Sequence, residues 1–233
     1  MFSNRTDAGK QLAKKLEFVK KENPVILAIP RGGVVVADAV ASFLDCKLDI
    51  IVSRKIGAPH NPELAIGAVL HDGSYFPNID VVKMLHIPQK YIDSEAAEQM
   101  KEVQRRLISY RGSIHYNLSG KTVILVDDGV ATGATMTVVA LWVKKQNPKK
   151  VIIAVPVGSR ETIQKLEEIV DEVVVFAIPD FFNAVGQFYE NFDQVEDAQV
   201  QKIMKKYGHS IYHSRFSAFL MASILHLMVT LLS

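Results

Sequence analysis

Five mostly apolar runs, rich in β-branched residues, divide the chain. They cover residues 25–29, 48–53, 123–126, 151–157 and 170–178. Runs of this length without strict alternation are typical of strands that are buried on both faces of a parallel sheet. Segments with apolar residues at helical spacing lie between and around them, over residues 6–20, 34–44, 93–110, 136–145, 161–168 and 197–207. Strands that alternate with helices predict an α/β fold with a mostly parallel central sheet flanked by helices.

The stretch Val123–Met136 (VILVDDGVATGATM) carries the strongest chemical signal. Two carboxylates, Asp127 and Asp128, follow the strand, and a turn of small and hydroxyl residues then leads into a helix. Such a turn lets backbone N–H groups and the positive end of the helix face a bound anion. Because an ionised carboxylate only accepts hydrogen bonds, it would pair with sugar hydroxyls rather than with a phosphate. The stretch therefore predicts a site for a phosphorylated sugar.

Two other interpretations of this stretch remain. Adjacent aspartates at a strand end also occur in magnesium-binding phosphotransfer sites, and a turn of small residues can be purely structural. The two common phosphate-binding patterns, G-x-x-x-x-G-K-[ST] and G-x-G-x-x-G, are absent here.

A second turn, Pro30–Gly33 (PRGG), follows the first predicted strand and precedes a long apolar helix. The guanidinium of Arg31 and the flexible backbone of Gly32 and Gly33 could face an anion. Alone, this turn would be interpreted as a tight connection with a solvated arginine. In a parallel sheet, however, both turns lie beyond the carboxyl ends of strands, where ligands bind. Together they predict two anion-binding turns at the same edge of the sheet.

These two motifs, in this order, resemble the phosphoribosyl-pyrophosphate signature and the pyrophosphate loop of the class I phosphoribosyltransferases. The resemblance covers about residues 6–207, and the run RKIGAPHNPELAIGAV is similar to an uncharacterised phosphoribosyltransferase-like subgroup. It implies the fold of that family, with a helical insertion over about residues 78–110, a hood region, and a strained or cis peptide near Arg31–Gly32.

The resemblance implies transfer of the 5-phosphoribosyl group from phosphoribosyl pyrophosphate, with Mg²⁺, to a nucleobase-like or other nitrogen acceptor, and release of pyrophosphate. The alternative is a non-catalytic regulatory protein that binds phosphoribosyl pyrophosphate or a nucleotide. A hydrolase is disfavoured because neither G-x-S-x-G nor H-E-x-x-H occurs.

The resemblance also implies residue roles. Asp127 and Asp128 would accept hydrogen bonds from the ribose hydroxyls, and Arg31 would hold pyrophosphate with Gly32 and Gly33. The loop residues expected to bind substrate are Gly129, Ala131, Thr132, Gly133, Ala134 and Thr135. Mg²⁺ would be bound mainly by pyrophosphate, sugar oxygens and water, so no side chain is assigned as its ligand.

Two further segments have expected roles, the first in catalysis together with Arg31 and the second in acceptor binding. Arg54 and Lys55 end the second predicted strand and lead into a proline-containing loop over residues 56–63. In the resembling enzymes a mobile flap at this place neutralises pyrophosphate and excludes water; an ordinary connector is the alternative. The aromatic-rich residues 179–193 would either cover a base-like acceptor or tether the end of the chain to the domain.

Composition narrows the class of protein. A chain of 233 residues with 48% hydrophobic residues can bury one core, which predicts a single domain over residues 1–208. The net charge of +2 gives no electrostatic reason to expect nucleic-acid binding. Cys46 is the only cysteine, which excludes an intramolecular disulfide. The N-terminal residues lack the apolar region of a signal peptide, so we expect a cytoplasmic protein.

A hydrophobic C-terminal extension over residues 209–233 has no counterpart in the resemblance. Its apolar part, residues 216–233, falls short of the roughly 20 residues that span a bilayer. Membrane contact, a partner-binding helix and an extension without function all remain open for it, as does homo-oligomerisation of the whole chain.

Overall fold

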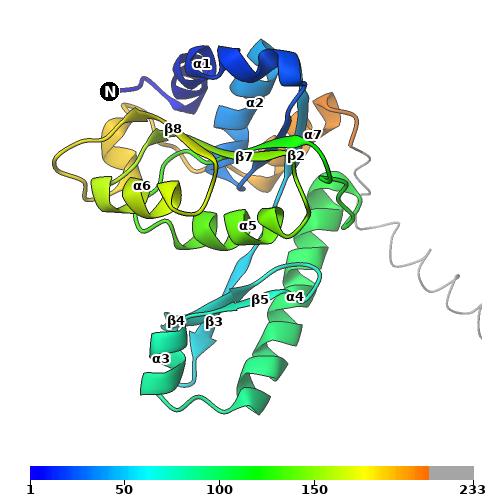
Figure 1. Ribbon diagram of the computed structural model, residues 1–233, viewed down its shortest axis with the longest axis vertical. Helices are drawn as coiled ribbons and strands as arrows, with labels where there is room; N and C mark the ends of the chain where they lie inside the picture. Colours follow the sequence, from blue (N-terminus) through cyan, green and yellow to red (C-terminus); the bar gives the residue numbers. More distant parts are fainter. Residues whose placement is uncertain (210–233) are drawn as a thin grey trace, which may run out of the picture.

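The computed structural model describes residues 1–209. At its centre is a five-stranded sheet in the order β2-β1-β6-β7-β8, in which all neighbouring strands are parallel (Figure 1). The strands are β1 (Val25–Ala28), β2 (Lys47–Ile50), β6 (Thr122–Val126), β7 (Lys150–Val157) and β8 (Glu172–Ala177). The predicted α/β fold with a parallel central sheet is confirmed.

Helices cover both faces of this sheet (Figure 1). One face packs against α1 (Arg5–Lys15), α2 (Gly32–Leu44) and α7 (Asp197–Lys206), and the other against α5 (Ala134–Lys144) and α6 (Arg160–Glu167). Successive strand residues point to opposite faces, so the fully buried Ile124 belongs to the first core and its fully buried neighbour Leu125 to the second. This two-sided burial explains why the strands are apolar runs without alternation.

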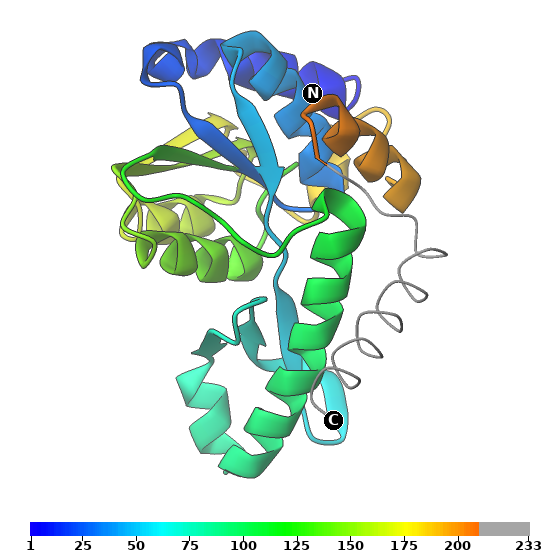
Figure 2. The same ribbon diagram turned by 90° about the vertical axis from the view of Figure 1, so that its right-hand side faces the viewer.

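A second lobe extends from the sheet, built around a three-stranded antiparallel sheet (Figures 1 and 2). Its elements are β3 (Arg54–Ala58), β4 (Asn61–Val69), β5 (Tyr75–Pro77), α3 (Ile79–Met84) and α4 (Gln89–Arg111). Helix α4 belongs to both lobes, because Ile92 near its start packs on the small sheet and Leu107 near its end packs in the main core. The described chain also contains the short 3₁₀ helices η1 (Glu17–Glu22) and η2 (Val185–Phe188).

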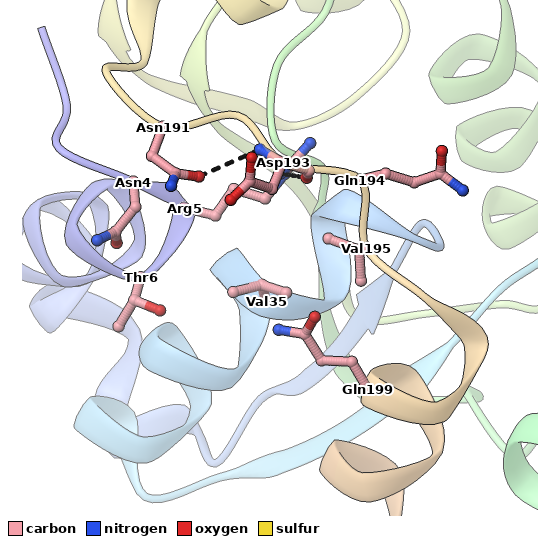
Figure 3. Close-up of a pocket in the computed structure, with 9 residues that line it drawn as sticks. All are labelled: Asn4, Arg5, Thr6, Val35, Asn191, Asp193, Gln194, Val195 and Gln199. Atoms are coloured by element: carbon pink, nitrogen blue, oxygen red, sulfur yellow. Dashed lines mark hydrogen bonds between the residues drawn. The ribbon is translucent and has the colours of Figure 1, made fainter.

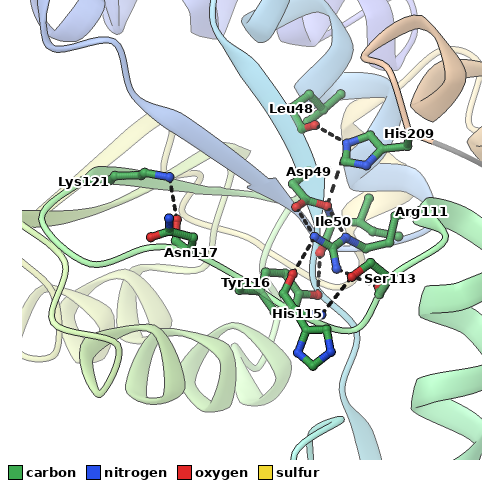
Figure 4. A network of polar contacts seen from close by, with 10 residues as sticks. All are labelled: Leu48, Asp49, Ile50, Arg111, Ser113, His115, Tyr116, Asn117, Lys121 and His209. Atoms are coloured by element: carbon green, nitrogen blue, oxygen red, sulfur yellow. Dashed lines mark hydrogen bonds and ion pairs between the residues drawn. The ribbon is translucent and has the colours of Figure 1, made fainter.

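A buried ion pair joins the end of α4 to the main sheet. The guanidinium of Arg111 donates to both carboxylate oxygens of Asp49 at 2.6 Å, and the Arg111 side chain is only 7% exposed (Figure 4). Arg111 also lies over the ring of Tyr116, whose hydroxyl donates to the carbonyl of Ile50 at 2.8 Å. These contacts fix the second lobe to strand β2.

The structure corrects the expected loop after the second strand. The second strand ends at Ile50, and residues 54–69 form a β-hairpin instead of the predicted proline-containing loop. The pairing of β3 with β4 is irregular, with register shifts on both sides of Gly57, and a β-carbon on Gly57 would lie 2.7 Å from the Cα atom of Pro62. Glycine at this position therefore allows the two strands to pair beside Pro62. A proline in a sequence usually indicates the end of a strand, so the hairpin was not expected.

The first predicted helix is also shorter than expected. It ends at Lys15, and the 3₁₀ helix η1 follows. Its N-cap is Asn4, whose side chain accepts from the N–H of Asp7. Among residues 1–209, no helix combines the length and the apolar character needed to cross a bilayer. The apolar run 216–233 lies outside the described residues, so the expectations for it stay predictions.

Candidate active site

The two turns predicted to bind anions lie side by side at one edge of the main sheet. Strands β1 and β6 are neighbours, with Ala28 opposite Val126, and the N–H of Ile29 donates to the carbonyl of Val126 at 2.9 Å. Both strands run in the same direction, so the segments that follow them leave the sheet at the same edge. The structure thus brings together two motifs that lie far apart in the sequence.

The glycines of the first turn fit against the aspartates of the second. A β-carbon on Gly33 would lie 2.8 Å from the Cα atom of Asp127 and 2.9 Å from its Oδ1 atom. A β-carbon on Gly32 would overlap the carboxylate of Asp128. These are close approaches that only glycine permits. The cis peptide bond joins Pro30 to Arg31, one bond before the position that the resemblance implies.

The loop before α5 borders a cavity of about 200 Å³. The residues that line this cavity are Asp127, Gly129, Val130, Ala131, Thr132, Gly133, Ala134, Thr135, Met136 and Val185. All the loop residues that the sequence predicts to bind substrate therefore line one cavity. Val185 completes the lining of the cavity. It belongs to η2, which lies far from the loop in the sequence.

Backbone N–H groups at the start of α5 face no side-chain cap. The N-cap residue is Gly133, at φ 69°, and no side chain caps the helix. The first N–H groups of a helix have no partner within the helix, so those of α5 can bind an anion. On the other side of the loop, the carbonyl of Ala131 accepts from the hydroxyls of Ser159 at 2.9 Å and Thr162 at 2.5 Å. The start of α6 thereby holds the loop in place.

The two aspartates have different surroundings. Asp127 accepts the backbone N–H of Asp128 at 2.8 Å. Burial raises the pKa of the Asp127 carboxyl well above its ordinary value, and the adjacent charge of Asp128 raises it further. Asp128 instead forms an ion pair with Arg5, whose Nε atom lies 2.7 Å from its Oδ2 atom. The pair therefore contains one carboxylate with a cationic partner and one that is buried beside it.

Arg5 is a site residue that the sequence analysis missed. Its Nη1 atom also donates to the carbonyl of Asp193 at 2.7 Å, and its guanidinium lies 3.8 Å from the ring centre of Phe192. It lines a cavity of about 210 Å³ with Asn191, Gln199 and residues near them (Figure 3). One signal was available: Arg5 places a cation in the first turn of α1, where the helix dipole favours anions.

The aromatic segment packs over the acid pair and onto the N-terminus. The hydroxyl of Tyr189 donates to the carbonyl of Asp128 at 2.6 Å, and the Tyr189 ring lies 5.4 Å from that of Phe2. The N–H of Phe2 donates to the carbonyl of Phe188 at 2.9 Å. Tyr189 and Phe2 are buried, whereas Phe181 is 85% exposed. Part of this segment therefore joins the N-terminus to the acid pair, while both expected roles of the segment stay predictions.

Comparison with known proteins identifies the family. Residues 3–193 match the model of the phosphoribosyl transferase domain. The chain belongs to this family. It is 41% identical over 201 residues to "Putative phosphoribosyl transferase Rv0571c" of Mycobacterium tuberculosis strain H37Rv, and the match covers 86% of this chain but 45% of that protein. The chain thus spans about half the length of the curated relatives it matches.

A solved structure shows the same family likeness over nearly its whole length. The crystal structure of TT1426 from Thermus thermophilus is 40% identical, with a TM-score of 0.78, and the match covers 89% of this chain and 99% of that one. The M. tuberculosis strain CDC 1551 protein named "Putative phosphoribosyl transferase MT0597" matches with the same identity and coverage as its H37Rv counterpart.

In this phosphoribosyl transferase domain, the three cations expected in catalysis lie in different places. Arg31 reaches toward α7, with its Nη1 atom 3.5 Å from the Oδ1 atom of Asp197. Arg54 donates to Gln99 on α4 at 2.7 Å and lies 3.7 Å from Glu102. Lys55 pairs with Glu63 at 2.9 Å. Each cation is thus paired with a polar group outside the loop cavity.

Arg54 and Lys55 point to different sides because neighbouring residues of a strand alternate in direction. Only Lys55 lines the cavity of about 460 Å³ between the hairpin and α5, where Ala134 and Thr135 form the opposite wall. The structure therefore brings Lys55, and not Arg54, to the same cavity as the start of α5.

Proposed function

We propose that this chain transfers the 5-phosphoribosyl group of phosphoribosyl pyrophosphate, with Mg²⁺, to a nitrogen of a nucleobase-like or other acceptor, and releases pyrophosphate. The family and the names of the curated relatives support phosphoribosyl transfer. One observation carries the choice of substrate. A loop cavity at an uncapped helix start lies next to an acid pair, against which the glycines of the Arg31 turn are packed.

Each part of this arrangement suits one part of the substrate. The N–H groups at the start of α5, with the hydroxyls of Thr132 and Thr135, would bind the 5′-phosphate. Asp127 and Asp128 would accept hydrogen bonds from the ribose hydroxyls. Arg31, Gly32 and Gly33 would hold the pyrophosphate.

The reaction breaks the bond between the anomeric carbon and the pyrophosphate oxygen, whose electron pair leaves with the pyrophosphate. A bond forms between that carbon and the acceptor nitrogen, which loses its proton. Positive charge develops on the sugar as in glycoside cleavage, so carboxylates beside the ribose stabilise it. The protein otherwise contributes by holding the sugar and the leaving group in line.

The donor set at this edge of the sheet fits Mg²⁺. Carboxylate and hydroxyl oxygens are hard ligands, and Mg²⁺ keeps several waters and substrate oxygens in sites of this kind. Asp127 and Asp128 would hold it through the ribose hydroxyls they bind. When bound, Mg²⁺ would add positive charge to the leaving pyrophosphate.

The cations would act after a rearrangement of their present partners. Arg31 is 3.5 Å from Asp197, and both side chains are substantially exposed, so an incoming pyrophosphate can compete for the guanidinium. Lys55, also in an exposed pair, borders the cavity beside α5 and is the better placed of the two hairpin cations. Arg54 would have to leave Gln99 first.

Incubation with Mg²⁺, phosphoribosyl pyrophosphate and a panel of nucleobases and other amines, followed by ³¹P NMR, tests this proposal. We expect pyrophosphate to appear only with an accepted amine. Binding of phosphoribosyl pyrophosphate without turnover across the panel would instead support a regulatory protein.

A double variant, D127N with D128N, tests the assignment of the acid pair. We expect it to bind phosphoribosyl pyrophosphate at least about tenfold more weakly, because Asp128 loses its charge and each amide presents one acceptor oxygen where the carboxyl group presented two. Glu161→Gln, on the exposed side of α6, is a matched carboxylate control. Unchanged affinity in the double variant would refute the site.

A further inference from the structure

The single guanidinium group of Arg5 makes three contacts. Its Nε atom is 2.7 Å from the Oδ2 atom of Asp128, its Nη1 atom donates to the carbonyl of Asp193 at 2.7 Å, and its planar face lies 3.8 Å from the centre of the Phe192 ring. The Arg5 side chain is 11% exposed and that of Asp128 is 15% exposed. A planar guanidinium suits three contacts at once, because its donors point in fixed directions within one plane while its faces remain free to stack.

The first consequence concerns charge. The groups that face Asp128 are Arg5 from α1, the adjacent Asp127, and the Tyr189 hydroxyl, which binds the backbone carbonyl of Asp128. Arg5 is the one cation among these groups. The positive charge of its guanidinium lies directly against the Asp128 carboxylate, which offsets the repulsion between the two adjacent acids.

The second consequence concerns orientation. Arg5 occupies the Oδ2 atom of Asp128, so its Oδ1 atom remains to accept from a ligand. A β-carbon on Gly32 would also lie 2.8 Å from the Nε atom of Arg5, so the guanidinium is packed between Asp128 and the turn expected to bind pyrophosphate. Arg5 thus limits how the Asp128 carboxylate can rotate.

The third consequence links the acid pair to residues 192–193. The same guanidinium that binds Asp128 binds the carbonyl of Asp193 and stacks on Phe192, whose ring in turn lies 5.0 Å from that of Tyr189. Movement of this aromatic segment would therefore move Arg5, and with it the Asp128 carboxylate.

We propose that Arg5 is a positioning residue for phosphoribosyl transfer, which fixes the orientation of the Asp128 carboxylate, offsets its negative charge and couples its position to the packing of residues 189–193. This inference rests on the proposed function, because it assigns Asp128 to the ribose. It extends that function by making sugar binding depend on the segment that covers the acid pair.

Binding of phosphoribosyl pyrophosphate with Mg²⁺, measured by calorimetry, tests the proposal with three variants. In R5Q the cation is lost, so we expect binding to weaken about tenfold. In R5K the charge remains but the planar fork is lost, so we expect a partial return of affinity. In F192L the stacking on Arg5 is lost while the ion pair with Asp128 remains, so we expect a smaller decrease.

Arg160→Ala is the matched control. Arg160 contacts Asp180 at the other end of the aromatic segment, at 3.3 Å, and both of these side chains are largely exposed. We expect it to bind like the wild type. Thermal melts of all variants identify any that fail to fold, and they are expected to show R5K and F192L folded.

A measurement without ligand separates this inference from the proposed function. Unfolding free energies of the ligand-free R5Q, D128N and double variants form a cycle, and we expect the two substitutions to be non-additive because each removes the same ion pair. Failure of the wild type to bind phosphoribosyl pyrophosphate would refute the proposed function, whereas the cycle would still show whether Arg5 and Asp128 are coupled.

Two results would overturn the inference. The first is an R5Q protein that binds phosphoribosyl pyrophosphate with wild-type affinity. The second is weaker binding in which R5K is no better than R5Q and the unfolding free energies of the Arg5 and Asp128 substitutions are additive. That second pattern would mean that Arg5 only tethers the N-terminal helix to the aromatic segment.

Discussion

A β-carbon added to Gly33 would lie 2.8 Å from the Cα atom of Asp127. Gly33 lies in the first turn of α2, shortly after β1, and Asp127 directly follows β6, so neither backbone can move far without moving its strand. The contact shows that the turn of Arg31 and the acid pair form one packed unit. Alanine substitutions at Gly32 and Gly33 can therefore separate the structural role of this unit from its expected role in ligand binding.

We expect G33A to lower the free energy of unfolding by roughly 1–3 kcal/mol, because its new methyl group meets backbone atoms that cannot rotate away. G32A is the matched variant, since its methyl group meets the side chains of Asp128 and Arg5, which can shift. We expect G32A to cost less stability but to weaken binding of phosphoribosyl pyrophosphate. Denaturant unfolding and calorimetric titration of both variants check this, and equal unfolding free energies would contradict it.

In the loop before α5, a second substitution can be chosen to relieve the clash that alanine at Gly133 would create. Gly133 has φ 69°, and a β-carbon there would lie 2.5 Å from the Cγ2 atom of Thr162. We expect G133A to cost about 1 kcal/mol or more and to weaken phosphate binding at the start of α5. T162S removes that methyl group and keeps the hydroxyl that binds Ala131, so G133A with T162S should regain part of both losses. If T162S restores neither the stability nor the phosphate binding that G133A loses, backbone strain alone causes both losses.

Stability should depend on pH through Asp127. Burial and the neighbouring Asp128 raise the pKa of its carboxyl, so the folded protein binds this proton more tightly than the unfolded chain. The resulting stability is fully present below the ordinary value of 3.8 and is lost as the pH rises through the folded-state pKa. We expect D127N, which cannot ionise, to unfold at a higher temperature than the wild type near pH 8.

The advantage of D127N should grow as the pH rises and should shrink toward pH 3.8, where Asp127 of the folded wild type is also neutral. Thermal melts across this range measure it. A constant difference at every pH would mean that the substitution acts through packing rather than through charge.

Glu102 offers a test of Arg54. This carboxylate binds Arg105 and Arg106 and lies 3.7 Å from Arg54, and its pKa is lowered to about 2, first by the hydrogen bond from Arg105. Its contribution to stability is present above the ordinary value of 4.5 and is lost as the pH falls toward about 2. For these partly exposed pairs we expect E102Q to cost at most about 1 kcal/mol.

If Arg54 serves the leaving pyrophosphate, E102Q should lower the KM for phosphoribosyl pyrophosphate, because one restraint on the guanidinium is gone. Glu98→Gln, one turn away in an exposed pair with Lys101, is the control. Steady-state kinetics measures the effect, and a KM equal to that of the control would remove Arg54 from the site.

The sequence by itself determined the local features of this protein. The strands could be predicted because both faces of the sheet are buried, which requires continuous apolar runs such as 123–126 and 151–157. The loop of residues 129–135 could be predicted to lie at a helix start, where it borders a cavity, because its small residues and that helix adjoin each other in the chain. The parallel sheet then required the turn of Arg31 to lie beside it.

Only the tertiary structure decided which distant side chains complete the site. Arg5 and Asp128 are 123 positions apart, and no local pattern reports an ion pair across that separation. The different directions of Arg54 and Lys55 followed from a hairpin whose proline and glycine resemble loop residues. Such features depend on packing between elements, because a side chain gains its partner only when separate parts of the chain fold against each other.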